Sequence, residues 1–221
     1  MPVLFNYPRQ ARFGQPVPKA KIYEYAKPTK ILRECFVDQI DKIIWEYKLA
    51  PETINLPAKP AVPEIQIFDI LLKTDELNEA VLHCIDKAIP FPIIYRLQFQ
   101  DQVKITAAYK RPSEAENGQW VISDYFSGDW LPSDSLTAEL PIALDLSGLY
   151  RQLLQPLLTW PQQSGESLQA QVERISKIRK TDNDRRKLEA RLQKEKQFNR
   201  KVELNAQLRQ LKQQLVALTT H

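Results

Sequence analysis

Glycine is scarce in this chain, with five residues among 221. Phosphate-binding loops need closely spaced glycines, and neither the P-loop nor the dinucleotide-binding fingerprint is present. Histidine is scarcer still, because His83 and His221 are the only two, which leaves a histidine-based triad or a zinc site short of residues. We therefore expect no cofactor, no metal site and no catalytic residue.

Cysteine and long apolar runs are also nearly absent. Cys35 and Cys84 lie inside apolar patterns, where cysteine is typical of a small buried residue rather than of a disulfide. No stretch approaches the roughly 20 apolar residues that a membrane span requires. The amino terminus shows no basic segment followed by an apolar run. These absences predict a cytoplasmic protein that does not contact the membrane.

Positive charge is concentrated at the carboxyl end. The net charge is +4, but residues 166–221 contain 14 Lys or Arg against 7 Asp or Glu, which leaves 17 against 20 in the first 165 residues. Such asymmetry is typical of a segment that meets an anionic partner, either a nucleic acid or an acidic protein surface. A helix kept in solution by mixed charges is the alternative explanation.

Residues 1–160 read as one α+β module. Prolines disfavour helix up to Pro28, whereas apolar residues at steps of three and four predict a helix over 29–47. A second helix, capped by Asp75, is expected to end at Pro90, and a third covers 146–158. Apolar or alternating runs predict strands at 64–72, 92–99, 103–110 and 120–126. The expected fold is a largely antiparallel sheet with helices packed on it.

A hinge at 161–167 is expected to lead into a helical, coiled-coil-like arm over 168–218. Its last part carries leucines at heptad steps, namely Leu204, Leu208, Leu211, Leu215 and Leu218. The polar stretch from Thr181 to Arg186 leaves open whether the arm is one helix or a hairpin that turns near Asn183. A lone amphipathic helix leaves its leucines exposed, so a second copy, a hairpin or another protein's helix must cover them.

Four groups of residues are candidates for function. The corner from Trp45 to Asn55 and the arm leucines are candidate protein interfaces; within the corner we single out Trp45, Tyr47, Lys48 and Asn55. The arm residues Lys194, Lys196, Arg200 and Lys201 are candidate nucleic-acid contacts, whose binding should weaken with salt. Aromatic residues at 109, 120, 125 and 130 form either a base-stacking platform or part of the core.

A metal-dependent nuclease is the enzymatic alternative. Such enzymes hold magnesium with acidic residues on adjacent strands, beside a lysine. The residues available are Glu64, Asp69 and Lys73 on one strand, Lys110 at the end of another, and the Glu46-Tyr47-Lys48 triplet, which is expected at a helix end. This match is poor, because Glu-x-Lys spacings arise often by chance.

Several segments resemble one prokaryotic family. They are Val17-Pro18-Lys19, the run from Ile43 to Asn55, Ile89-Pro90, Tyr109-Lys110 and the run from Gln197 to Asn205. Over nearly its whole length the chain resembles domain of unknown function 4391. The resemblance implies genes placed near helicases and DNA methyltransferases, as in restriction or phage-defence clusters.

These observations together favour a non-enzymatic accessory subunit of a DNA-defence or restriction-modification-like system, working with a helicase and a DNA methyltransferase. The partner is expected at the Trp45 to Asn55 corner or at the arm, where self-association is the alternative. A metal-dependent nuclease and a free-standing protein that binds DNA or RNA are the competing hypotheses.

Overall fold

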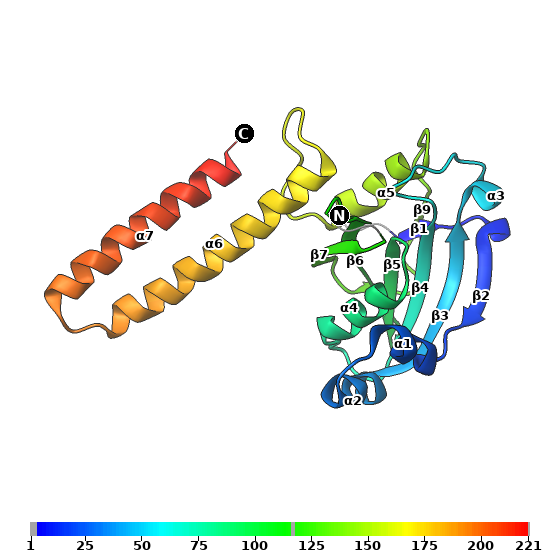
Figure 1. Cartoon of the computed structure of the whole chain (residues 1–221), viewed down its shortest axis with the longest axis horizontal. Coiled ribbons are helices and arrows are strands. Elements are labelled where there is room, and N and C mark those ends of the chain that lie inside the picture. Colours follow the sequence, from blue (N-terminus) through cyan, green and yellow to red (C-terminus); the bar gives the residue numbers. More distant parts are fainter. Residues whose placement is uncertain (1–3, 116–117, 221) are drawn as a thin grey trace. The chain divides into compact units, whose positions relative to one another are not determined.

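The structure is a computed structural model, which describes residues 4–115 and 118–220. The chain forms two compact units, Met1–Leu158 and Thr159–His221 (Figure 1). Strands occur only in the first unit, as far as the described residues go, and the second consists of two long helices. The expected α+β class is therefore confirmed.

A mostly antiparallel sheet forms the centre of the first unit. Its strand order is β2-β3-β4-β5-β6-β7, with β8 paired to β6, and β4 and β5 are the parallel neighbours. The strands are β2 (Arg12–Pro16), β3 (Ile40–Leu49), β4 (Ile65–Leu72), β5 (Ile93–Phe99), β6 (Gln102–Pro112), β7 (Trp120–Ser127) and β8 (Leu131–Pro132). A separate two-stranded sheet pairs β1 (Leu4–Asn6) with β9 (Thr137–Glu139).

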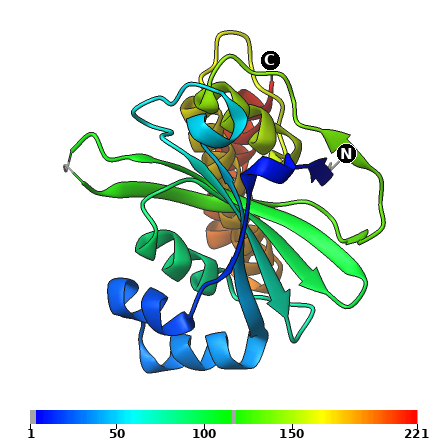
Figure 2. The same cartoon turned by 90° about the vertical axis from the view of Figure 1, so that its right-hand side faces the viewer.

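Helices cover both faces of the main sheet. One face carries α1 (Lys19–Ala26), α2 (Lys30–Gln39) and α4 (Glu79–Ala88), which lie together in Figure 2. The core on this side includes Phe36, Phe68 and Tyr95. The opposite side is packed by α5 (Leu146–Leu154) and the 3-10 turn η2 (Gln155–Leu157). Two short pieces, η1 (Arg9–Ala11) and α3 (Pro51–Ile54), complete the unit.

The predicted strands at 64–72, 92–99, 103–110 and 120–126 correspond to β4, β5, β6 and β7. The predicted helix over 29–47 is wrong in its second half, because α2 ends at Gln39 and β3 follows. Irregularities in the β3–β4 register, one of them between Ile40 and Lys42, add residues to β3. An added residue brings Ile40 and Ile43 to the same face, so the strand imitates the three-residue step of a helix.

Two expectations about helix starts are also wrong. The segment before Pro28 contains α1, because the eight residues after Pro18 are free of proline and Pro18 stands at the N-cap, where no backbone N–H is needed. The helix after β4 begins later than expected. Asn78, not Asp75, caps α4, and its side-chain oxygen accepts the N–H of Ala80 at 2.9 Å.

The second unit is a helical hairpin of α6 (Leu168–Lys194) and α7 (Phe198–Thr219) packed side by side (Figure 1). Of the two alternatives left open for the arm, the hairpin is present, but its turn is not near Asn183, because α6 continues through that position. Asp182 pairs with Arg185 at 2.7 Å and with Arg186 at 2.8 Å, and such pairs one turn apart stabilise a polar helical stretch. The chain turns at residues 195–197 instead, where the Glu195 carboxylate accepts the N–H groups of Lys196 and Gln197.

Candidate functional site

An open groove of about 550 Å³ lies on the face of the sheet that carries α1 and α4. Strands β2, β3 and β4 contribute Phe13, Trp45 and Phe68, and α1 contributes Tyr25. The segment that follows α4 closes one side with Phe91. We call this surface the Trp45 groove. It is lined mainly by apolar and aromatic side chains, and among the described lining residues Lys21 alone carries a charge.

The aromatic wall of the Trp45 groove is fixed at its base and open at its rim. The Trp45 ring lies 4.2 Å from Phe13 and 6.2 Å from Phe68, between ring centroids, and its Nε1 donates to the Tyr47 carbonyl at 3.0 Å. Phe68 is fully buried, whereas Phe13 is 45% exposed and Tyr25 is 72% exposed. The groove therefore presents two large rings to solvent on a rigid floor.

A polar cluster follows the floor of the groove along β3 and β4. Buried Gln66 donates to the Glu64 carboxylate, and the Lys48 ammonium lies 2.6 Å from Glu52 and 3.5 Å from Glu64. The hydrogen bond from Lys48 holds the pKa of Glu52 below its ordinary value, and the same bond raises the pKa of Lys48. A lysine thus occupies the space between the two carboxylates.

The structure separates the residues singled out in the Trp45 to Asn55 corner. Trp45 lines the groove, but Tyr47 packs on the opposite face, 4.8 Å from the Tyr7 ring, with the Arg96 guanidinium 5.5 Å away. Asn55 ends α3 with a φ of 54°, a left-handed conformation that asparagine tolerates. Only Trp45 therefore belongs to the groove wall, while Lys48 lies in the neighbouring cluster and Tyr47 and Asn55 have local structural contacts.

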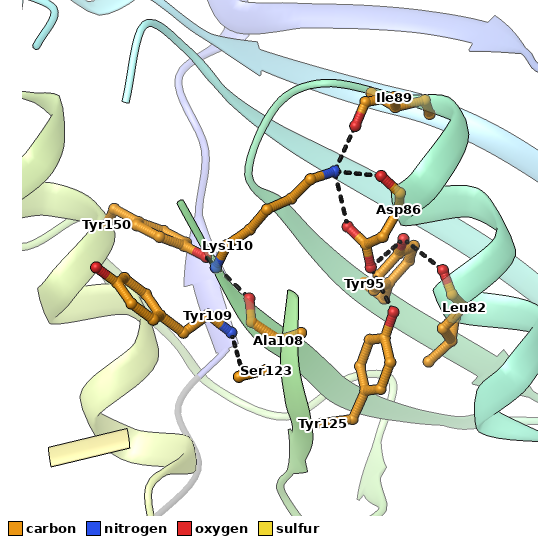
Figure 3. Close-up of polar contacts among 10 residues, drawn as sticks. All are labelled: Leu82, Asp86, Ile89, Tyr95, Ala108, Tyr109, Lys110, Ser123, Tyr125 and Tyr150. Carbon is orange, nitrogen blue, oxygen red and sulfur yellow. Dashed lines mark hydrogen bonds and ion pairs between the residues drawn. The ribbon is translucent and has the colours of Figure 1, made fainter. Parts of the chain in front are cut away.

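A second group of polar residues is buried in the first unit, and its contacts are drawn in Figure 3. The Lys110 ammonium donates to the Asp86 carboxylate at 3.3 Å and to the carbonyls of Asp86 and Ile89, near the end of α4. The other Asp86 oxygen accepts the hydroxyls of Tyr95 at 3.0 Å and Tyr125 at 2.5 Å. Burial raises the pKa of Asp86 and lowers that of Lys110, although each partner opposes the other's shift. This cluster joins α4 to β5, β6 and β7.

The residues proposed for a nuclease are engaged in separate contacts. Asp69 accepts two bonds from Arg96, at 2.5 and 2.6 Å, and one from Gln98 at 2.9 Å. Lys73 donates to the Val37 carbonyl at 2.7 Å. The Glu46-Tyr47-Lys48 triplet lies on β3, not at a helix end as expected, and Glu46 pairs with Arg12 at 2.9 Å. Within the described ranges no group of three His, Cys, Asp or Glu side chains is arranged to hold a metal ion.

The aromatic residues considered either for a stacking platform or for the core do not share one surface. Tyr125 is buried against Asp86, and Tyr109 stacks on Tyr150 with ring centroids 6.2 Å apart. The Trp130 ring faces the Lys104 ammonium at 5.1 Å, and Trp120 faces that of Lys110 at 5.8 Å. These residues belong mainly to the packing of the unit.

In the second unit, the hairpin covers part of the leucine seam. Leu204 and Leu208 are buried, and Leu211, Leu215 and Leu218 are half-buried. A hairpin was one of the three arrangements expected to bury the arm leucines, and it is the arrangement present within this chain. The candidate nucleic-acid residues Lys194, Lys196, Arg200 and Lys201 gather around the turn between α6 and α7, all exposed. His221 lies outside the described residues.

Sequence reasoning identified Trp45 but missed the groove and the enclosed Asp86–Lys110 cluster. The groove walls come from segments as distant as Phe13 and Phe91. One usable signal for the cluster was a lysine placed directly after the apolar stretch of β6, because a cation there must find a partner when the strand is buried.

The comparisons with known proteins gave one match. A family model described as Domain of unknown function (DUF4391) matches residues 5–215. No curated protein and no solved structure matches the chain. None of the helices in the described part of the chain has the length and apolar character to cross a bilayer.

Proposed function

The chain belongs to the DUF4391 family, and from that premise we propose that it is a non-enzymatic accessory subunit that docks a partner protein. The resemblance to this family implies a setting beside helicases and DNA methyltransferases in a prokaryotic defence or restriction-modification-like system. The partner that the proposal names is one of those two enzymes, in the cytoplasm.

The observation that carries the proposal is the Trp45 groove. Phe13 and Tyr25 expose 45% and 72% of their surface on the rim of a groove of about 550 Å³. Large aromatic side chains on a rigid, concave surface are typical of the few residues that dominate the free energy of protein binding. The Phe13–Trp45–Phe68 contacts pre-organise the wall, so that docking orders few side chains.

The shape and charge of the Trp45 groove indicate its occupant. A side chain with an apolar or aromatic anchor matches the lining, and Lys21 at the rim favours an acidic neighbour beside that anchor. Addition of a strand to the edge of β2 is less suitable, because Gly14 has a φ of 63° and Pro16 has no N–H to donate. We therefore assign the groove to a segment of the partner that binds through its side chains.

The test is affinity purification of the tagged protein from its native host with the gene cluster intact. The double variant Phe13→Ala/Tyr25→Ala is expected to lose the helicase or methyltransferase that the parent recovers. Ile31→Ala is the matched control, since Ile31 is 74% exposed on α2 and does not line the groove.

Two results contradict the proposal. Recovery of neither enzyme by the parent chain removes the accessory-subunit role. Equal recovery by the parent and by the double variant removes the groove as the docking site, even if the partner is correct.

A further inference from the structure

A row of cations, interrupted once by Asp184, runs along one face of α6. Its members are Lys177, Lys180, Lys187, Arg191 and Lys194, and all five are exposed. They are spaced by three, seven, four and three positions, and at about 3.6 residues per turn these steps keep them on one side of the helix. We call them the α6 basic stripe. Asp184 lies on the same face and offsets one of the five charges.

The cations of the α6 basic stripe differ from other cations of the hairpin in having no carboxylate partner. Arg174 binds Glu166 at 2.7 Å, Arg185 binds Asp182 and Glu189 at 2.7 Å each, and Lys212 lies 3.5 Å from Glu189. Those pairs tie parts of the hairpin together. For the five stripe residues the described part of the chain contains no ion pair, and all five side chains are exposed. Arg191 also lies close enough to Glu195 to add to the hydrogen bonds from Gln197 and Lys196 that lower the pKa of that carboxyl.

The turn of the hairpin continues the stripe. Lys196, Arg200 and Lys201 are exposed there, and Phe198 is 78% exposed beside them. The Glu195 carboxylate is engaged by the N–H groups of Lys196 and Gln197 at 2.8 and 2.9 Å, and it lies 3.7 Å from Arg200. Its negative charge is thus partly neutralised within the turn, which leaves an excess of positive charge at that end.

The length of the stripe fits the backbone of duplex DNA. From Lys177 to Lys194 it extends about 25 Å at about 1.5 Å per residue. Each DNA strand carries a phosphate about every 3.4 Å along the axis, so a stripe of this length runs past about seven phosphates. A hairpin of two packed helices is wider than the roughly 12 Å major groove, which favours contact with the backbone rather than with base edges.

We infer that the α6 basic stripe is a binding surface for the phosphate backbone of duplex DNA, without base readout. A membrane surface fits less well, because interfacial helices place an apolar face beside their cations. None of the large hydrophobic side chains exposed in the described part of the chain lies on α6. This inference is carried by the helical hairpin alone and does not require a partner in the Trp45 groove.

The test measures binding of the full chain to a labelled 20-base-pair duplex by fluorescence anisotropy over a range of salt concentrations. Five phosphate contacts predict a slope of about −4.5 for log K against log[salt], and each removed cation lowers its magnitude by about one. The triple variant Lys187→Gln/Arg191→Gln/Lys194→Gln is expected to flatten the slope by about three. Circular dichroism checks that the helices persist.

The matched control removes three exposed lysines of the first unit, Lys30→Gln/Lys42→Gln/Lys87→Gln. It changes the net charge equally and is expected to keep the parent slope. Phe13→Ala/Tyr25→Ala is also expected to bind DNA like the parent, which distinguishes failure of this inference from failure of the docking proposal.

Several results overturn the inference. The first is that the full chain does not bind the duplex at low salt. The second is that both triple variants reduce the slope of log K against log[salt] equally. The third is that binding to vesicles rich in anionic lipid depends on the stripe residues while binding to the duplex does not. Preference for single-stranded DNA of the same length would also overturn it, since the rigid stripe is assigned to a duplex.

Discussion

Lys110 and the lysines of the α6 basic stripe differ most in what surrounds them. Lys110 is 1% exposed and donates all its hydrogen bonds inside the first unit, whereas Lys177, Lys180, Lys187 and Lys194 face solvent. A buried ammonium must be fully paired, because the cost of removing it from water is several kcal/mol. The difference teaches that burial decides the role of a lysine here: Lys110 links elements of the first unit, while the stripe lysines stay exposed on α6.

The largest effect is expected from breaking the enclosed cluster. Lys110→Met leaves the Asp86 carboxylate buried without its cation and removes a donor from two carbonyls near the end of α4. We expect the free energy of unfolding to fall by about 3–5 kcal/mol in urea titrations. Lys87→Met, on the exposed side of α4, is the control, with a change within about 0.5 kcal/mol.

The double variant Lys110→Met/Asp86→Asn sharpens this result. An amide at position 86 still accepts the Tyr95 and Tyr125 hydroxyls but carries no charge, so the double variant is expected to be more stable than Lys110→Met. If it is less stable, the uncompensated carboxylate is not the cause of the loss.

A smaller effect is expected in the hairpin. Leu204 is 4% exposed on α7, so Leu204→Ala leaves a cavity and is expected to lower hairpin stability by about 2–3 kcal/mol. Hydrogen exchange of the α7 amides reports this without interference from the first unit. Phe198→Ala, at 78% exposed, is the matched control and is expected to leave the exchange rates unchanged. Equal effects of the two variants would contradict the burial described for the seam.

The pH dependence of stability is expected to depend on His83 in the first unit. Burial, followed by the nearby Lys87, lowers the pKa of His83 on α4 below the ordinary 6.5. The folded chain then binds fewer protons than the unfolded chain, so stability is expected to fall as the pH drops below about 6.5. Thermal melts of the parent and of His83→Gln at pH 7.5 and 5 measure this. A variant that loses as much stability as the parent on acidification would show that His83 is not responsible.

The smallest expected effect concerns nuclease activity. Because Asp69, Glu46 and Lys110 are each engaged in a different set of contacts, incubation of the parent with Mg²⁺ or Mn²⁺ and labelled DNA or RNA is expected to cut nothing. Asp69→Ala provides the comparison. Cleavage by the parent that Asp69→Ala abolishes would show that the first unit also uses charge for chemistry.

The sequence was most informative where one periodicity dominated. The strands β4 to β7 follow apolar or alternating runs, and α5 follows leucines at helical steps. It misled over Ile40–Leu49, because an added residue in the strand imitates helical spacing. It left open a turn near Asn183, where ion pairs along α6 continue the helix. The extra residues of β3 are defined only by its pairing with β4, whereas the partners of Asp182 lie three and four positions away in the local sequence.

The sites were harder to predict than the fold. Trp45 could be singled out as an aromatic residue among charges, but Phe13 and Phe91 join it only through the sheet. Asp86 and Lys110 are 24 positions apart, on different elements, and nothing local connects them. The four cations near the hairpin turn were identifiable as a cluster because they are close in sequence.

The second irregularity of β3 has a consequence for how this strand can change length. Trp45 is paired with Phe68 and Tyr47 with Ile67, so Glu46 is an extra residue opposite neither. Loss of Glu46 would leave the flanking side chains on their present faces relative to β4, and it would remove the ion pair to Arg12. Loss of Ile44 would instead shift the register of β3 by one residue, so that the side chains before or after position 44 would point to the opposite face of the sheet. Within this strand, position 46 is thus a place where the chain can be shortened by one residue while Trp45 stays in the groove.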